Sequence, residues 1–200
     1  MWGGSKVYYF CGLFWGDGYL DTERNRFSFT AADEELLSFC SEYFKKIHPD
    51  ITPRRNQKED SNCYSVVASS KILMDFLKWC GVPNSKYTAT VKTIPKRFFS
   101  ISERKIAAFL SGLFDTDGTV HAYKHGKGLC VDFCTSSKEM AHQVHVLLLQ
   151  FGIVSTITTE KARGEMEIIG VKTFGNESYK VRITGKDSLD LFRDKIGFRL

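Results

Sequence analysis

The sequence predicts an α+β fold built from two similar halves, each running helix, two strands, helix, two strands, helix. The first observation is an internal repeat, because residues 9–18 recur at 109–118 in a chain of 200 residues. The second is that segments with the two-residue period of a strand alternate with segments of helical period. The third is composition: 42% hydrophobic and 26% charged residues are typical of a folded domain and exclude a largely disordered chain.

The repeat defines the predicted organisation of the chain. Its strongest part has Gly-Leu-Phe followed by Asp-Gly in both copies, at 12–18 and at 112–118. A repeat placed half-way along a chain indicates a duplicated structural unit. We therefore predict a first half at 1–82, a linker with little helical periodicity at 83–101, and a second half at 102–200.

The first helix of each half covers the strongest part of the repeat. Apolar residues recur at helical spacing through 7–14, which predicts a helix that ends at the Asp-Gly pair. In the second half, Ser100 and Glu103 have the spacing of a capping box and predict where the helix begins. Asp33 and Ser137 are good N-cap residues for the middle helix of each half.

The predicted strands have one apolar and one polar face. Residues 26–30 and 179–184 alternate between aromatic or aliphatic side chains and polar or basic ones. The apolar face is expected to cover the core, and the polar face is expected to lie open. A Gly-rich stretch at 162–177 has no counterpart in the first half and predicts a long hairpin loop.

Charge and cysteine content exclude several classes of protein. The net charge of +5 permits a polyanionic partner without requiring one. No apolar run is long enough to cross a membrane, and the N-terminus lacks a secretory cleavage site, so an intracellular location is expected. The six cysteines are then expected to be reduced thiols. The Cys and His pairs lack the spacing of zinc sites, so buried thiols and surface imidazoles are the preferred interpretation.

Small residues in the two repeated helices indicate that these helices pack backbone to backbone. Glycine or serine occurs at 12, 16, 111 and 112, although glycine costs about 1 kcal/mol inside a helix. Such packing would bring Asp17 and Asp117 to the same end, where two carboxylates repel unless a cation lies between them. Oxygen ligands favour Mg²⁺.

A calcium loop starting at Asp115 is excluded, because its twelfth residue is Gly126 rather than Glu. Without a metal, the helices would form a purely structural seam.

The two copies resemble the two LAGLIDADG motifs of the homing endonucleases, at 11–18 and 110–118. Lys92-Thr93-Ile94-Pro95 resembles the K-x-I-P block between the motifs of intein-type members, and 196–198 resembles the block that closes their second half. The resemblance covers nearly the whole chain.

The resemblance implies a single-chain pseudo-dimer of two αββαββα lobes, monomeric in solution, with the motif helices at the lobe interface. Curved antiparallel sheets would form a saddle for double-stranded DNA. Asp17 and Asp117 would bind Mg²⁺, with the backbone carbonyls of Gly16 and Thr116, and Mn²⁺ or Ca²⁺ could substitute in binding. Members of this family cut both strands across the minor groove and leave short 3′ overhangs. The protein would need access to genomic DNA in the cytoplasm, nucleoid or an organelle.

Phosphodiester cleavage needs an activated water, relief of charge in the transition state and help for the leaving oxygen, and metals near two acids supply all three. Lys92 is a candidate catalytic residue that would polarise water or stabilise charge. No residue of the second half is an obvious equivalent of Lys92. The alternative interpretation of Lys92 is a solvated linker lysine.

Strand alternation gives a candidate DNA-binding set, because a two-stranded ribbon can enter the major groove and contact base edges. The predicted set comprises Arg24, Arg26, Ser28, Thr30, Arg54, Arg55, Gln57, Lys124, Lys127, Thr156, Thr158, Lys180, Arg182 and Thr184.

Two other functions remain open at the level of sequence. The first is a catalytically idle relative that binds DNA or RNA, such as an intron maturase or a regulator. The second is a binding module whose repeat is only structural. A splicing intein needs a nucleophilic first residue and a C-terminal His-Asn pair, so a chain running from Met1 to Leu200 is not expected to splice. A free-standing enzyme, an intron product and an excised endonuclease domain all fit.

Overall fold

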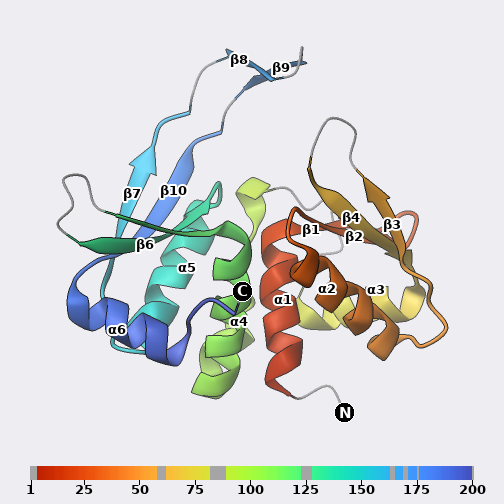
Figure 1. Cartoon of the computed structure of the whole chain (residues 1–200), viewed down its shortest axis with the longest axis horizontal. Coiled ribbons are helices and arrows are strands. Elements are labelled where there is room, and N and C mark those ends of the chain that lie inside the picture. The colour runs from red at the N-terminus through yellow and green to blue at the C-terminus, as the bar shows by residue number, and fades with distance from the viewer. Residues whose placement is uncertain are drawn as a thin grey trace. The chain divides into compact units, whose positions relative to one another are not determined.

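The computed structural model describes residues 4–57, 62–81, 89–122, 128–162, 165–168, 171–174 and 176–199 (Figure 1). The elements of the first half are α1 (Ser5–Asp17), β1 (Gly18–Asp21), β2 (Arg26–Ala31), α2 (Glu34–Ile47), β3 (Arg54–Gln57), β4 (Tyr64–Ser69) and α3 (Lys71–Cys80). The 3₁₀ turns η1 (Ala89–Val91) and η2 (Lys96–Ser100) follow. The elements of the second half are α4 (Glu103–Asp117), β5 (Gly118–Ala122), β6 (Leu129–Thr135), α5 (Lys138–Leu149), β7 (Ser155–Glu160), β8 (Glu165–Ile168), β9 (Val171–Phe174), β10 (Ser178–Ile183) and α6 (Lys186–Lys195). The predicted α+β fold and its order of elements are confirmed.

The chain packs as two compact units that do not follow the repeat. One unit spans 1–87, 104–116 and 198–200, and the other spans 88–103 and 117–197, counting the described residues of each. Most of α4 therefore packs with the first half. The boundaries at 82 and 102 remain a prediction about the duplicated sequence.

Two glycines explain why α4 packs against α1. A Cβ atom added to Gly12 would lie 2.1 Å from the carbonyl oxygen of Phe109. A Cβ atom added to Gly112 would lie 2.3 Å from the carbonyl oxygen of Tyr9. The two backbones therefore touch at a position that admits no side chain, and Leu13 and Leu113 are fully buried beside it. This contact, which we call the glycine seam, is the one that the small residues predict.

The sheet of the first unit is antiparallel with the order β1-β2-β4-β3. Phe27 and Phe29 of β2 are fully buried, and the ring of Phe27 packs edge-on against Phe44 of α2 at 4.9 Å between centroids. The alternate residues of β2 point to the other face, which we call the open face of the sheet. The predicted division into apolar and polar faces is confirmed for this strand.

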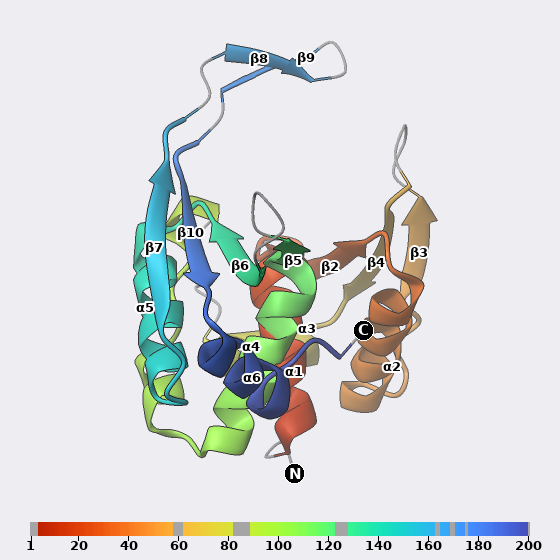
Figure 2. The same cartoon turned by 60° about the vertical axis from the view of Figure 1, so that its left-hand side comes forward.

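The sheet of the second unit has the corresponding order β5-β6-β10-β7. Phe133, Val181 and Ile183 are fully buried on the face that α5 covers. Between β7 and β10 the chain forms the separate hairpin β8–β9, which lies beyond the ends of those two strands (Figure 2). The hairpin predicted at 162–177 is therefore present, and its described residues include the paired strands 165–168 and 171–174.

Local helix signals are confirmed with one exception. The side chain of Asp33 accepts a hydrogen bond from the amide of Glu35 at 2.8 Å, and that of Ser137 accepts one from Met140 at 3.1 Å. The predicted capping box of Ser100 is wrong, because Ser100 ends the turn η2 and α4 begins only at Glu103. Within the described residues, no helix is long and apolar enough to cross a membrane.

Candidate active site and nucleic-acid interface

Asp17 is the last residue of α1 and is exposed. It lines a hollow of about 550 Å³ on the open face of the first sheet, together with Tyr19, Ser28, Thr30, Ala31, Ala32, Cys63 and Ser65. The hydroxyls of Thr30 and Ser65 lie 2.7 Å apart in a hydrogen bond. The hollow therefore offers a carboxylate and several hydroxyls, a set of hard oxygen atoms suited to Mg²⁺.

Asp117 is the last residue of α4 and is half-buried. The residues directly before the two acids touch each other, because a Cβ atom added to Gly16 would lie 1.9 Å from Thr116 Oγ1. Thr116 Oγ1 donates to the carbonyl of Leu113 at 2.9 Å, so its hydroxyl bonds back onto its own helix. The two acids therefore follow the last contact of the glycine seam, one on each helix.

Each acid affects a neighbouring thiol. Burial, together with the negative charge of Asp17, raises the pKa of Cys40 in α2. Burial is also the main reason that the pKa of Cys134 in β6 is raised, and Asp117 is one of the carboxylates that add to this effect. Neither thiol is therefore a nucleophile at neutral pH.

Asp115 has a structural role that the sequence did not indicate. Its Oδ2 accepts a hydrogen bond from the hydroxyl of Tyr9 at 2.6 Å, and its Oδ1 accepts one from the amide of Arg199 at 3.1 Å. The guanidinium of Arg199 lies 4.6 Å from the centre of the Tyr9 ring. Burial raises the pKa of Asp115, although these hydrogen bonds oppose that shift. Asp115 thus connects α4 to α1 and to the last described residue.

The segment that carries Lys92 is held against α5 in the second unit. The carbonyl of Lys92 accepts a hydrogen bond from Ser137 Oγ at 2.6 Å. The side chain of Gln143 binds both backbone groups of Ile94, accepting from its amide at 2.5 Å and donating to its carbonyl at 3.1 Å. Ile94 is buried. Gln143 was not predicted as part of the site, because nothing in its spacing relates it to a residue 49 positions earlier.

The open face of the first sheet differs in part from the predicted set. Cross-strand pairs place Arg54 opposite Val67 and Asn56 opposite Ser65, so both belong to the open face with Arg26, Ser28 and Thr30. Arg26, Arg54 and Asn56 also line a second hollow of about 560 Å³. Asn56 was absent from the predicted set, because the strand has no apolar residues to indicate its face.

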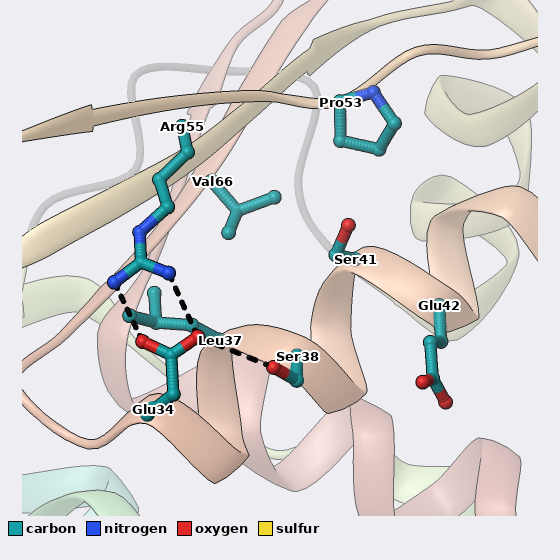
Figure 3. Close-up of a pocket in the computed structure, with 8 residues that line it drawn as sticks. All are labelled: Glu34, Leu37, Ser38, Ser41, Glu42, Pro53, Arg55 and Val66. Atoms are coloured by element: carbon teal, nitrogen blue, oxygen red, sulfur yellow. Dashed lines mark hydrogen bonds and ion pairs between the residues drawn. The ribbon is translucent and has the colours of Figure 1, made fainter.

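Arg54, Arg55 and Gln57 were all predicted to contact DNA, but they do not lie on one face, so this part of the predicted set is wrong. Arg55 and Gln57 alternate with Arg54 along β3 and therefore point to the face that α2 covers. The guanidinium of Arg55 binds Glu34 of α2 through two hydrogen bonds, at 2.7 and 2.5 Å (Figure 3). The same guanidinium lies 4.3 Å from the centre of the Tyr64 ring. Arg24 lies in the turn after β1, where its amide binds Asp21 at 3.2 Å.

The open face of the second sheet contains Thr156, Thr158, Lys180 and Arg182, as the alternation predicts. Arg182 donates through Nε and Nη2 to both carboxylate oxygens of the buried Asp132, each at 2.7 Å. Lys180 binds Glu160 at 2.7 Å. Two donors of Arg182 are therefore engaged within the sheet. Thr184 lies just beyond the end of β10, and Lys124 and Lys127 lie outside the described residues.

Comparison with known proteins identifies the family. The family model of the LAGLIDADG-like domain matches residues 5–81 and 104–197. The chain belongs to this family. The two matched segments contain both motif helices and both four-stranded sheets.

Curated relatives of this LAGLIDADG protein have several different names. The replication factor C small subunit of Methanocaldococcus jannaschii is 29% identical over 94% of this chain, and that of Thermococcus kodakarensis is 30% identical over the same share. The ribonucleoside-diphosphate reductase NrdEB subunit alpha of Bacillus subtilis is 31% identical over 72% of it. The chain spans 9%, 19% and 13% of the length of these three relatives.

Solved structures share the fold at low identity. A structure of mesophilic variants of the homing endonuclease I-DmoI aligns with 96% of this chain and 95% of its own, with a TM-score of 0.63 and 17% identity. Full-length DUF199/WhiA from Thermatoga maritima aligns with 98% of this chain and 57% of its own, with a TM-score of 0.61 and 15% identity. The two-motif LAGLIDADG fold is thus confirmed.

Proposed function

We propose that this chain is a homing endonuclease, which makes a site-specific, metal-dependent double-strand break in DNA and leaves short 3′ overhangs. The observation that carries the proposal is the position of the acids: Asp17 and Asp117 each end a motif helix, directly after the contact of Gly16 with Thr116. Polar and basic side chains of the open faces would contact the DNA backbone and base edges.

The donor set around the acids fits a divalent cation of the Mg²⁺ class. Asp17 and Asp117 would hold it with the carbonyls of Gly16 and Thr116, and the hydroxyls of Thr30 and Ser65 line the hollow beside Asp17. A bound metal would lower the pKa of the attacking water and would stabilise the negative charge of the transition state. Structures of I-DmoI are named as complexes with DNA and Mn or Ca, which supports divalent metals in this fold.

Lys92 would stabilise the negative charge that develops on the phosphate during cleavage. The backbone carbonyl of Lys92 accepts a hydrogen bond from Ser137, and the backbone amide of Ile94 donates one to Gln143. These hydrogen bonds at Lys92 and Ile94 restrict the backbone of the segment. The Lys92 side chain would therefore extend from a fixed backbone position.

The names of the curated relatives support an inserted module. A replication factor subunit and a reductase subunit share no activity by name, yet each contains a stretch similar to this chain. The shared stretch is a small part of each protein, so none of those activities explains it. An endonuclease domain of the intein type, inserted into different proteins, would explain this distribution.

A second candidate is a relative that binds DNA or RNA without cutting it, since DUF199/WhiA has the same fold. Retention of both acids favours the nuclease.

Incubation with Mg²⁺ and a randomised library of double-stranded DNA sites, followed by sequencing of the cut ends, tests the proposal. We expect a recurring site with 3′ overhangs, and none with Asp17→Asn. Enrichment of a bound site without cut ends would support the second candidate. No preference for duplex DNA would exclude the nuclease.

A further inference from the structure

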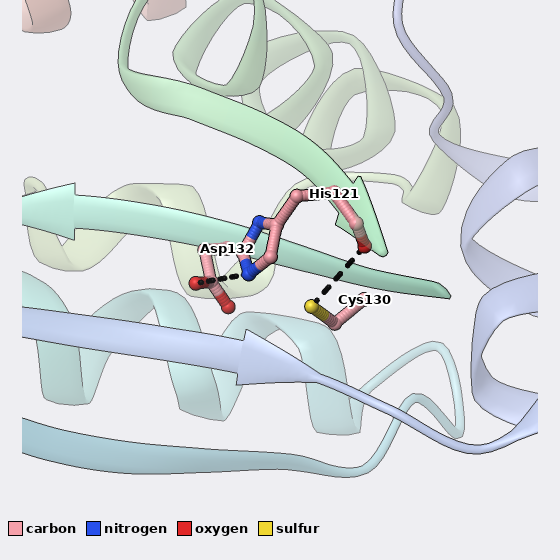
Figure 4. A group of neighbouring side chains, drawn as sticks. All are labelled: His121, Cys130 and Asp132. Atoms are coloured by element: carbon pink, nitrogen blue, oxygen red, sulfur yellow. Dashed lines mark hydrogen bonds and ion pairs between the residues drawn. The ribbon is translucent and has the colours of Figure 1, made fainter. Parts of the chain in front are cut away.

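A second group of metal-ligating side chains lies on the open face of the second sheet. His121 of β5 and Cys130 of β6 are cross-strand partners, and Asp132 lies two residues further along β6 on the same face (Figure 4). One ligand atom from each of these side chains lies within 4.8 Å of the others. Spacing in the sequence argued against a zinc site here, but the pairing of β5 with β6 brings the three residues together.

The distances are close to those of a tetrahedral site. His121 Nε2 lies 3.6 Å from Asp132 Oδ2. Zinc bonds of about 2.0–2.2 Å to nitrogen and oxygen and about 2.3 Å to sulfur put nitrogen and oxygen ligands about 3.3 Å apart, and sulfur about 3.5 Å from either. The imidazole and the carboxylate are therefore nearly in place. Cys130 Sγ donates to the backbone carbonyl of His121 at 3.4 Å and lies within 4.8 Å of a ligand atom of each of the other two side chains, so it would turn from this carbonyl toward the metal.

Neighbouring side chains orient the three ligands, and the side of the group at His121 is accessible to solvent. Cys130 and the side chain of Asp132 are almost fully buried, whereas the side chain of His121 is 40% exposed. Arg182 binds both oxygens of Asp132. Each carboxylate oxygen has a second lone pair, so the carboxylate can accept from Arg182 and still bind a cation. Such outer contacts orient ligands in many metal sites.

We propose that His121, Cys130 and Asp132 bind a divalent cation of the zinc class, with water as the fourth ligand. On binding, the Cys130 thiol releases its proton to solvent, and the sulfur then donates an electron pair to the metal without any change of oxidation state. Mixed nitrogen, sulfur and oxygen donors favour Zn²⁺ over Mg²⁺, so this site is chemically distinct from the one proposed at the acids.

The metal would fasten β5 to β6 close to Asp117. Strand β5 begins at Gly118, directly after that acid. Only residues 118–120 of β5 separate Asp117 from His121. A metal that ties His121 to β6 would therefore restrict the strand that leaves the acid.

Titration of the metal-free, reduced protein with Co²⁺ tests this site directly. We expect one equivalent to produce a thiolate-to-cobalt charge-transfer band in the near ultraviolet, which Zn²⁺ then abolishes by displacement. Cys130→Ser should lose the band. Cys134→Ser is the matched control and should keep it, because Cys134 lies on the same strand and face but outside the group.

Thermal unfolding gives a second readout that does not need nuclease activity. Zn²⁺ should raise the Tm of the wild type and of Cys134→Ser, and should do so much less for His121→Ala, whose exposed side chain can be removed without harming the fold. A cobalt spectrum without the thiolate band, or a band that survives Cys130→Ser, would overturn the proposal. The band should persist in Asp17→Asn, so failure of this site and failure of the nuclease are distinguishable.

Discussion

Asp17 and Asp117 are the residues on which the proposed nuclease depends. Replacing either with asparagine keeps the size of the side chain but removes a negative charge and a metal ligand. We expect Asp17→Asn and Asp117→Asn to abolish double-strand cleavage, while DNA affinity changes by only a few-fold and the free energy of unfolding does not fall. Plasmid cleavage and gel-shift titration measure the two effects. Cleavage at the wild-type rate in both variants would remove the metal assignment.

Arg182 has a structural partner that limits its use as a base-reading residue. Arg182→Ala would leave the buried carboxylate of Asp132 without its bidentate partner. Breaking such a pair costs about 3–5 kcal/mol. We expect a loss of this size in denaturant unfolding with a chelator present, and partial recovery in the double variant Arg182→Ala/Asp132→Ala. Arg26→Ala, at an exposed position of β2, should change stability by only about 0.5 kcal/mol.

The half-buried carboxyl of Asp115 gives stability a defined dependence on pH. Its pKa in the folded protein is raised, mainly by burial, so folding favours its protonated form. Its contribution to the free energy of unfolding is complete below the unfolded pKa of about 4 and is lost as pH rises through the folded pKa. The stability of the wild type relative to Asp115→Asn should therefore increase as pH falls from 7 to 4. A difference that stays constant over this range would contradict the assignment.

At the scale of elements, the glycine seam determines how α1 and α4 meet. Gly12→Ala places a methyl group against the backbone carbonyl of Phe109, which cannot rotate aside. Alanine gains about 1 kcal/mol of helix propensity, but overpacking costs about 1–3 kcal/mol or more. We expect a net loss of stability in denaturant unfolding. The three atoms nearest to a Cβ atom added at Gly16 all belong to the Thr116 side chain, which can shift more easily than a backbone carbonyl. The loss for Gly16→Ala should therefore be smaller, and the reverse order would count against a backbone contact.

The sequence predicted elements well where periodicity is strong. Strand β2 alternates Phe27 and Phe29 with polar residues, so the pattern alone identifies its buried face. Strand β3 is Arg-Arg-Asn-Gln and has no apolar residue, so only its register with β4 shows that Arg54 and Asn56 share a face. Alternation along a strand is informative only when one face is buried.

Long-range contacts in the site were the least predictable part. The bonds of Asp115 to Tyr9 and Arg199 join residues 106 and 84 positions apart, and no local pattern relates them. The same holds for Gln143 and Ile94. The positions of the two acids were predictable, because the repeat marks them directly.

At the scale of the whole molecule, the two halves differ in their basic residues. Lys92 follows the first half, and no residue of the second half is an obvious equivalent of it. Lys92→Ala should therefore slow the cutting of one strand by about 10²–10⁴-fold and leave the other strand and the DNA affinity nearly unchanged. Nicked plasmid should accumulate before linear product appears. Equal slowing of both strands would show that Lys92 does not serve one site, and a proportional loss of binding would identify it as a phosphate contact.

The glycine seam is reciprocal, because each glycine meets the carbonyl that lies three residues before the glycine of the other helix. A reciprocal contact is isologous, so either helix could in principle pair with a copy of itself. Joining the two halves in one polypeptide turns that association into an intramolecular event that no longer depends on protein concentration. The two sheets are then free to diverge, since a substitution on one open face is not repeated on the other. A covalent pair of this kind can recognise a target whose two halves have different sequences, whereas a pair of identical subunits would favour a palindrome.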